Sequence, residues 1–425
     1  MAALRLSKNR QLERDVGQLL WIGFHGSEWS DATGRDLCFG TSVADAAAVA
    51  GAAVIFRHNI RPRVPASNAK AGSHQAERPG SRPVERPDDL AAVVELARSL
   101  HDLSSRAGRG DGTPTWIAID QEGGRVQRVR QPATVWPPML SFEHVLGTSD
   151  AETVQQSAAD SAVESLAEAV GEAMGLELAA LGIDIDFAPV LDVHSNPANP
   201  IIGDRAFGTE AECTSRRALS FARGLASAGV LGCGKHFPGH GDTTTDSHLI
   251  LPRLDHELDR LAAVELLPFR RAIGAGIPLI MTAHIVFSAL DSALPATLSR
   301  RVVSGLLRRE LGFAGIVVSD DLGMKAIAAH HDIGEAAVLA VQAGCDALLV
   351  CHDRDQQERA YHSLIRAAES ASEIRERINQ SAARIRTAKK IHFERRAALM
   401  PGAWQTLCGS AEHRNLAAKL ARGAV

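Results

Sequence analysis

The stretch that decides the fold is Val230-Leu-Gly-Cys-Gly-Lys-His-Phe-Pro-Gly-His-Gly-Asp-Thr-Thr-Thr-Asp-Ser-His248. Its beginning, residues 230–235, is short and nearly all apolar, which is typical of a parallel strand buried on both faces. Pro238, Gly239 and Gly241 then exclude a regular helix. The strand therefore ends in a loop rich in titratable groups, and loops on rigid scaffolds carry much of protein chemistry.

Asp246 and His248 close this loop two positions apart, so on an extended segment their side chains point the same way. A carboxylate beside an imidazole fixes its tautomer and raises its basicity, and a histidine that titrates near neutral pH suits general acid/base catalysis. The alternative is a polar turn whose side chains cap backbone groups. We favour a functional loop, because so many titratable groups rarely gather in one turn-rich segment without a function.

Apolar runs of the same kind recur along the chain, separated by amphipathic stretches. The predicted strands are 19–24, 52–57, 116–120, 183–187, 230–235, 278–283, 316–319 and 347–350. The predicted helices include 90–103, 162–181, 213–228, 257–275 and 299–311. Alternation of strand and helix indicates an α/β fold, and about eight such units predict a TIM-type (β/α)8-like barrel.

Polar residues lie in or directly after the predicted strands. They are Asp120, Asp184, Asp186, Asp192, Lys235, His236, His284 and Asp320. Barrel active sites form at the C-terminal ends of the strands, so we expect nearly all of these side chains on one rim. Any single acid among them has the alternative of capping the next helix.

Two loops add arginines to this rim. Residues 120–126 leave a strand through two glycines, where an acid can bind two sugar hydroxyls, and we expect Arg125 to pair with an internal acid. This loop matches neither phosphate-binding glycine pattern. Arg205 is a candidate anion or carbonyl binder, with a structural ion pair to Asp204 or another loop acid as the alternative.

The stretch Ile316-Val-Val-Ser-Asp-Asp-Leu-Gly-Met324 is a buried strand that ends in two acids. Adjacent residues on an extended chain point in opposite directions. We therefore expect one of Asp320 and Asp321 to face the mouth of the barrel and the other to cap the next helix. A lone carboxylate that faces a pocket can act as a nucleophile toward an oxocarbenium-like carbon.

Composition excludes several classes of function. The formal net charge of -4 gives no support for a nucleic-acid or anionic-membrane partner. The six cysteines form no Cys-x-x-Cys pair, so we expect reduced core residues rather than a zinc knuckle or a disulfide framework. The first residues lack the apolar run of a secretory signal, and no apolar stretch is long enough to span a bilayer. We expect a cytoplasmic protein.

Two segments depart from the barrel pattern. We expect a single catalytic domain over 1–390, with a flexible insertion at 61–88 and a C-terminal helical extension at 391–425. The insertion is interrupted by five prolines, namely Pro62, Pro65, Pro79, Pro83 and Pro87. It cannot bury enough apolar surface to order itself, and we favour a disordered passenger over a lid.

Together these motifs resemble those of one enzyme family. The matching segments are, in chain order, 120–126 (DQEGGRV), 186–193 (DFAPVLDV), 203–208 (GDRAFG), 235–243 (KHFPGHGDT), 246–248 (DSH), 281–284 (MTAH) and 319–321 (SDD). They resemble glycoside hydrolase family 3 β-N-acetylglucosaminidases of the NagZ type over roughly residues 12–350. The insertion is longer than the usual connection in this family, and the C-terminal extension lies outside its single-domain pattern.

The resemblance implies a retaining β-N-acetylhexosaminidase with Asp320 as the nucleophile, His248 as the acid/base and Asp246 as its orienting partner. The residues that it implies hold the N-acetylglucosamine ring are Asp120, Arg205, Lys235 and His236. It implies a muropeptide-derived substrate, GlcNAc β-1,4-linked to 1,6-anhydro-N-acetylmuramic acid, and hence peptidoglycan recycling in the cytoplasm. It implies no cofactor or metal, and we expect a monomer or weak dimer.

Three other readings stay open. A metal-dependent hydrolase would use His236, His240, Asp242, Asp246 and His248 as zinc ligands. The glycines and the proline of the loop destroy the helical histidine spacing of zincins, which argues against it. A family 3 β-glucosidase would act on glucosides instead, and a non-catalytic sugar-binding barrel would bind GlcNAc without turnover.

Overall fold

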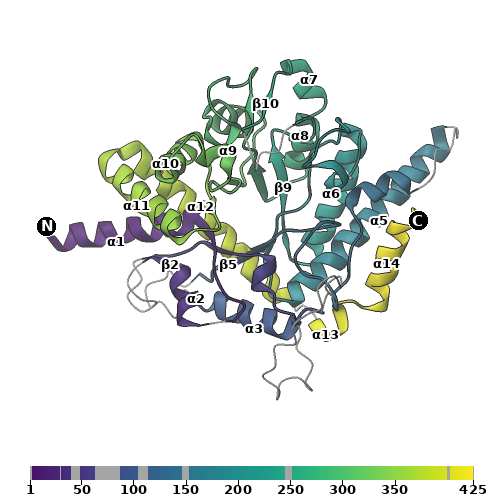
Figure 1. The fold of residues 1–425 in the computed structure, drawn as a ribbon, viewed down its shortest axis with the longest axis horizontal. Coiled ribbons are helices and arrows are strands. Elements are labelled where there is room, and N and C mark those ends of the chain that lie inside the picture. Colours follow the sequence, from purple (N-terminus) through teal and green to yellow (C-terminus); the bar gives the residue numbers. More distant parts are fainter. Residues whose placement is uncertain are drawn as a thin grey trace, which may run out of the picture.

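The structure, a computed structural model, describes residues 2–28, 30–39, 48–62, 87–103, 113–145, 153–244, 251–399 and 403–424. One sheet of eight parallel strands forms its centre, in the order β13-β11-β9-β8-β5-β4-β1-β14 (Figure 1). These strands are β1 (Leu20–Gly23), β4 (Ala52–Ile55), β5 (Trp116–Ile119), β8 (Ile185–Asp186), β9 (Leu231–Phe237), β11 (Leu279–Thr282), β13 (Ile316–Val318) and β14 (Leu348–Val350). All eight lie where the sequence predicts them.

The two end strands of this sheet approach each other, so the sheet is nearly closed into a barrel. An isolated parallel bridge joins Val318 to Ala347, and the Ser319 N–H donates to the Ala347 carbonyl at 2.9 Å. The predicted (β/α)8-like barrel is confirmed. The remaining strands form two-stranded pairs outside it, namely β2 (Cys38–Phe39) with β3 (Ala48–Val49), β6 (Gln121–Gly123) with β7 (Val126–Gln127), and β10 (Arg253–Leu254) with β12 (Val286–Phe287).

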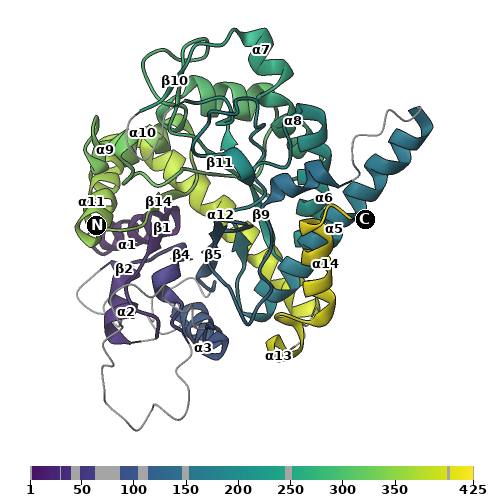
Figure 2. The same ribbon diagram turned by 45° about the vertical axis from the view of Figure 1, so that its right-hand side comes forward.

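Helices surround the barrel and cover its outer face (Figures 1 and 2). The longer ones are α1 (Ala2–Leu19), α3 (Leu90–His101), α5 (Thr153–Ala180), α6 (Ala211–Ser227), α8 (Leu266–Gly274), α10 (Ile333–Ala343), α11 (Arg354–Ser370), α12 (Ser372–Leu399) and α14 (Ala411–Ala421). Short helices are α2 (Asp31–Asp36), α7 (Leu258–Ala263), α9 (Lys325–Ala328) and α13 (Trp404–Leu407). The helix predicted over 257–275 is divided into α7 and α8, and the one over 299–311 is a π-helix, Arg301–Glu310.

The interior of the barrel is a packed core rather than a pore. Alternate strand residues point inward, and the largest are Trp21, Trp116 and Phe187. The two indole rings meet edge to face at 5.8 Å between centroids. The helix α12 crosses the N-terminal end of the barrel (Figure 2), where Ile385 and Phe393 join this inner core. The N-terminal end of the barrel, called the lower end below, is therefore closed by α12. A site can form only at the C-terminal ends of the strands.

A buried polar network fixes α12 to this lower end, with Asp184 at its centre. The Asp184 carboxylate accepts the Ile117 N–H at 2.8 Å and contacts His101 at 2.8 Å, His392 at 3.0 Å and Arg396. The expectation that Asp184 lies on the active rim is therefore wrong. It precedes β8, so it stands at the opposite end of the barrel from the residues that follow the strands.

The chain after α12 packs as a helical extension, as predicted, and α14 runs beside α5 (Figure 1). Glu177 of α5 anchors it, because its carboxylate accepts the Gly409 N–H and contacts Nδ1 of His413, both at 2.9 Å. The helix α12 runs through residue 390, so no break in the chain marks the domain boundary predicted there. That boundary stays a prediction. Of the insertion, residues 63–86 lie outside the described residues.

The six cysteines are all free, and Cys38, Cys233, Cys345 and Cys351 are buried, in agreement with their predicted role in the core. Within the part of the chain that the structure describes, no helix combines the length and apolar character needed to cross a bilayer.

Candidate active site

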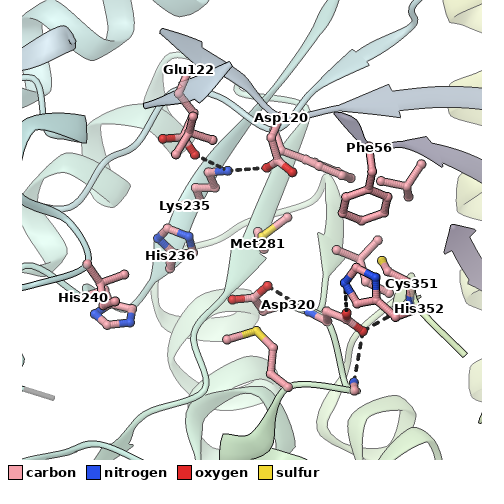
Figure 3. Close-up of a pocket in the computed structure, with 18 of the residues that line it drawn as sticks. Phe56, Asp120, Glu122, Lys235, His236, His240, Met281, Asp320, Cys351 and His352 are labelled. Carbon is pink, nitrogen blue, oxygen red and sulfur yellow. Dashed lines mark hydrogen bonds and ion pairs between the residues drawn. The ribbon is translucent and has the colours of Figure 1, made fainter. Parts of the chain in front are cut away.

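A cavity of about 510 Å³ opens at the C-terminal ends of the barrel strands (Figure 3). Its walls include side chains that follow six of the strands, namely β4, β5, β8, β9, β13 and β14. Of the seven predicted site residues, the structure brings five together in this cavity, namely Asp120, Arg205, Lys235, His236 and Asp320. The other two, Asp246 and His248, belong to 245–250, outside the described residues.

A buried lysine joins two acids on one side of the cavity. Nζ of Lys235 lies 2.8 Å from Oδ1 of Asp120 and 2.6 Å from Oε1 of Glu122. Burial alone would lower the pKa of Lys235, but the two carboxylates raise it above its ordinary value. Burial conversely favours the neutral form of Asp120, yet Lys235 and Arg128 hold the pKa of Asp120 below its ordinary value. The three groups are therefore all charged at neutral pH.

Glu122 is a further residue of this site, and it was not predicted from the sequence. It accepts two hydrogen bonds from Arg205, at 2.7 Å from Nε and 2.8 Å from Nη2. Against the effect of burial, Arg205 and Lys235 hold the pKa of Glu122 far below its usual range. The signal was its position two residues after Asp120, which puts both acids on the same side of an extended chain.

The sequence left two roles open for Arg205, a ligand-binding one and a structural ion pair, and its position allows both. It forms a structural ion pair, though with Glu122 rather than Asp204, and it also lines the cavity. Asp204 instead pairs with Arg125 at 3.1 Å, where both side chains are nearly half exposed. The expectation that Arg125 pairs with an internal acid is therefore wrong.

Asp192 organises the start of the loop that follows β9. Its carboxylate accepts the backbone N–H groups of His236, at 3.1 Å, and His240, at 2.7 Å. It also contacts Nδ1 of His236 at 2.7 Å. An ionised carboxylate can only accept a hydrogen bond, so Nδ1 of His236 donates to Asp192, and this contact orients a ring that lines the cavity.

His240 lies beside this ring in a buried position. Its Nδ1 is 2.8 Å from the Thr243 hydroxyl, and the two imidazole centroids are 5.7 Å apart. Burial, followed by the nearby His236, lowers the pKa of His240 to about 4. His240 is therefore neutral at physiological pH and adds no charge to the cavity.

Asp320 follows β13 and presents its carboxylate to the cavity (Figure 3). Oδ1 accepts the Asp321 N–H at 2.8 Å. Burial raises the pKa of this carboxyl, but His284 and His236 outweigh that effect and hold it below its ordinary value. An ionised carboxylate in a cavity is the state that a nucleophile at a sugar carbon requires.

Asp321 does not cap the next helix, contrary to our expectation. Its Oδ1 accepts the Gly323 N–H at 3.0 Å and the Cys351 N–H at 3.2 Å, so it binds the turn before α9 and the end of β14. Asp321 also lines the cavity and contacts His352 at 3.4 Å. Both adjacent acids therefore reach the cavity, although in different environments.

Asp186 is a further buried acid near Lys235. Asp186, at the end of β8, accepts the Gln121 N–H at 2.9 Å with Oδ1, while Oδ2 has no hydrogen-bond partner among the described residues. Burial raises the pKa of Asp186 well above its ordinary value. This carboxyl is therefore neutral, whereas Asp120 is ionised.

A cluster of possible metal ligands lies outside the cavity wall. Among the described residues, Asp242, His256 and Glu265 form a cluster with the donor atoms of a metal site. Of the zinc ligands considered from the sequence, Asp242 belongs to this cluster, whereas His236 and His240 do not. Their Nδ1 atoms face Asp192 and Thr243, as described above.

Comparison with known proteins identifies the family. The glycosyl hydrolase family 3 N terminal domain matches residues 81–388. Beta-hexosaminidase A of Pseudoalteromonas piscicida is 35% identical over 361 residues, which are 80% of this chain and 57% of that protein. The chain thus spans little more than half of that relative.

Solved structures agree. A glycoside hydrolase family 3 beta-N-acetylglucosaminidase from Paenibacillus sp. str. FPU-7 is 36% identical with a TM-score of 0.76, over 97% of this chain and 68% of that one. NagZ from Neisseria gonorrhoeae in complex with N-trifluoroacetyl-D-glucosamine is 28% identical with a TM-score of 0.62, over 87% of this chain and 98% of that one. The chain belongs to glycosyl hydrolase family 3, and its relatives are of the NagZ-like, beta-hexosaminidase type.

Proposed function

We propose that this chain is a retaining β-N-acetylhexosaminidase that hydrolyses terminal β-linked N-acetylglucosamine. The observation that carries this proposal is the ionised Asp320 carboxylate in a cavity that also holds the Asp120–Lys235 pair. The names of the relatives support the same reaction, since those proteins are hexosaminidases and acetylglucosaminidases.

In the proposed mechanism, Asp320 attacks the anomeric carbon while His248 protonates the glycosidic oxygen, and the leaving sugar departs. A covalent glycosyl-enzyme results. His248, now neutral, takes a proton from water, which attacks the same carbon and releases GlcNAc with retained configuration. Asp246 orients the imidazole and stabilises its protonated form, as the third member of a triad does. The roles of Asp246 and His248 rest on the sequence motif.

The charged network on the other side of the cavity is proposed to hold the sugar ring. The Asp120 carboxylate accepts ring hydroxyls, and Lys235 keeps that carboxylate ionised and fixed. Arg205 and His236 add donor and acceptor positions on the cavity wall. Glu122 positions Arg205 and Lys235 through three short contacts. A preorganised network of this kind loses little entropy when the sugar binds.

The finer substrate and setting also remain proposals. We propose GlcNAc-1,6-anhydro-N-acetylmuramic acid and its peptide derivatives as the natural substrate, and peptidoglycan recycling in the cytoplasm as the process. The family resemblance and the NagZ-like relatives support this proposal. Release of GlcNAc from that disaccharide, compared with release from chitobiose, tests the aglycone.

The test of the activity is the hydrolysis rate on an aryl β-N-acetylglucosaminide, with and without a chelator. We expect turnover that the chelator does not change and that falls at least about 10³-fold in Asp320→Ala, since the variant lacks its nucleophile. Unimpaired hydrolysis by Asp320→Ala would contradict the assignment. Faster turnover of the matching aryl glucoside would indicate a β-glucosidase, and binding of GlcNAc without turnover a sugar-binding protein.

A further inference from the structure

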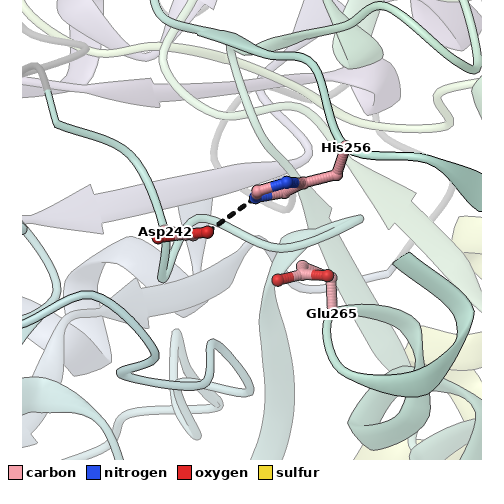
Figure 4. A group of neighbouring side chains, drawn as sticks. All are labelled: Asp242, His256 and Glu265. Carbon is pink, nitrogen blue, oxygen red and sulfur yellow. Dashed lines mark hydrogen bonds and ion pairs between the residues drawn. The ribbon is translucent and has the colours of Figure 1, made fainter. Parts of the chain in front are cut away.

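Asp242, His256 and Glu265 converge from three segments that are separate in sequence (Figure 4). Asp242 lies in the loop after β9, His256 lies between β10 and α7, and Glu265 directly precedes α8. Nε2 of His256 is 2.6 Å from Oδ2 of Asp242, and one ligand atom from each residue lies within 4.8 Å of the others. None of the three lines the cavity of the candidate active site.

The Glu265 carboxylate is the unusual member of this cluster. Its side chain is only 3% exposed, yet neither carboxylate oxygen accepts a hydrogen bond in the described part of the chain. A buried carboxylate normally receives several N–H or O–H donors, because its desolvation is costly without them. Glu265 therefore lacks the hydrogen-bond donors that a buried carboxylate requires, and a bound cation would compensate for them.

Arg260 forms a long ion pair with each of the two acids, but it does not satisfy the Glu265 oxygens by hydrogen bonds. Nη2 of Arg260 lies 3.3 Å from Glu265 and 3.5 Å from Asp242, and makes no hydrogen bond with the Glu265 oxygens. The Arg260 side chain is about one-third exposed and sits on the short helix α7, so it can turn into solvent. One guanidinium thus stands at the edge of two carboxylates and an imidazole.

We propose that Asp242, His256 and Glu265 bind a divalent transition-metal ion of the zinc type, with the Arg260 side chain displaced into solvent. One imidazole nitrogen and two carboxylate oxygens are a donor set that suits Zn²⁺, whereas Mg²⁺ prefers oxygen ligands alone. Metal–ligand bonds of about 2.0–2.2 Å require only that the Asp242–His256 contact opens and that Glu265 moves inward. Water completes the coordination.

The position of the site indicates a structural rather than a catalytic role. Asp242 and His256 are fourteen residues apart and lie on either side of 245–250, and Glu265 ties both to the start of α8. A metal bound to all three crosslinks these segments, and a ligand that binds the folded state raises the melting temperature. The site is independent of the chemistry proposed for the cavity.

The test is zinc binding to the full chain, stripped of metal and carrying His248→Ala, so that Asp246 and His248 cannot form a second site. Titration calorimetry with ZnCl₂ should show one bound ion, and bound Co²⁺ should give a visible d–d absorption band that reports its coordination geometry. Glu265→Gln and His256→Gln should each weaken zinc binding by roughly tenfold or more. MgCl₂ should give no binding at the same concentrations.

Two further variants separate a metal site from a purely structural ion-pair network. Arg260→Ala should strengthen zinc binding, because it removes the competing cation, while Asp259→Asn, an exposed acid on the same helix, should leave it unchanged. The proposal is overturned if the His248→Ala protein binds no zinc, or if Glu265→Gln and His256→Gln bind it as tightly as their parent. Zinc affinity that Arg260→Ala does not raise would also contradict it.

Discussion

Nζ of Lys235, in the last part of β9, lies 2.8 Å from Oδ1 of Asp120, which directly follows β5. This contact crosses the end of β8, so a cation and an anion from two non-adjacent strands neutralise each other at the cavity wall. Both groups are desolvated, and each depends on the other to stay charged.

Removing the Lys235 cation should therefore lower the stability of the protein as well as its activity. We expect Lys235→Met to lose roughly 3–5 kcal/mol of unfolding free energy, because Asp120 and Glu122 keep their charges without this partner. Urea denaturation at pH 7 measures it. The matched control is Lys390→Met, which removes an exposed lysine and should change stability by less than about 0.5 kcal/mol. Equal stability of the two variants would contradict the importance of the buried contact.

Asp120 and Asp186 should respond differently to replacement by asparagine. Asp186 is neutral because burial raises its pKa, so Asp186→Asn keeps the charge and shape and should change stability and kcat/KM by no more than roughly 1 kcal/mol. Asp120 is ionised, because the nearby cations lower its pKa. Asp120→Asn should lower kcat/KM on an aryl β-GlcNAc at least about tenfold, or ~1.4 kcal/mol. A larger effect for Asp186→Asn would reverse this assignment.

The pH dependence of stability should report His240. Its pKa is about 4 in the folded protein against 6.5 ordinarily, so the unfolded state binds the proton first. The free energy of unfolding therefore falls as the pH decreases from 6.5 to 4, by up to about 3 kcal/mol from this residue. His240→Gln should remove that part of the slope in urea unfolding measured between these pH values. His362→Gln, at an exposed position, should retain the full slope.

Ending the chain at the predicted domain boundary, residue 390, should destabilise the lower end of the barrel. A chain of residues 1–390 loses His392 and Arg396, which both bind Asp184, and should lose about 3–5 kcal/mol of stability. A chain of residues 1–402 keeps these contacts and loses α13 and α14. We expect it to unfold at a higher urea concentration than 1–390. Equal midpoints would show that the Asp184 network adds no stability.

The positions of the barrel strands could be predicted because parallel strands buried on both faces leave short apolar runs. The same reasoning predicted four of the five site residues that meet in the cavity, since Asp120, Lys235, His236 and Asp320 end or follow such runs. Arg205 was found through its loop and the family motif.

The errors have a common physical origin. Asp184 was placed on the wrong rim because β8 contains only Ile185 and Asp186, so a boundary error of two residues moves an acid to the other end of the barrel. The pairing of Arg125 and the ligands of Asp321 depend on contacts between distant segments. Periodicity in sequence carries no information on such contacts, so they became visible only in the folded chain.

The central claim is that Asp320, rather than the adjacent Asp321, forms the covalent intermediate. The most direct measurement is to incubate the enzyme with a fluorinated β-N-acetylglucosaminide whose glycosyl-enzyme hydrolyses slowly, and to locate the label by mass spectrometry of peptides. We expect one sugar on Asp320 and none on Asp320→Ala. A sugar on Asp321, or turnover of the reagent with no labelled peptide, would contradict it.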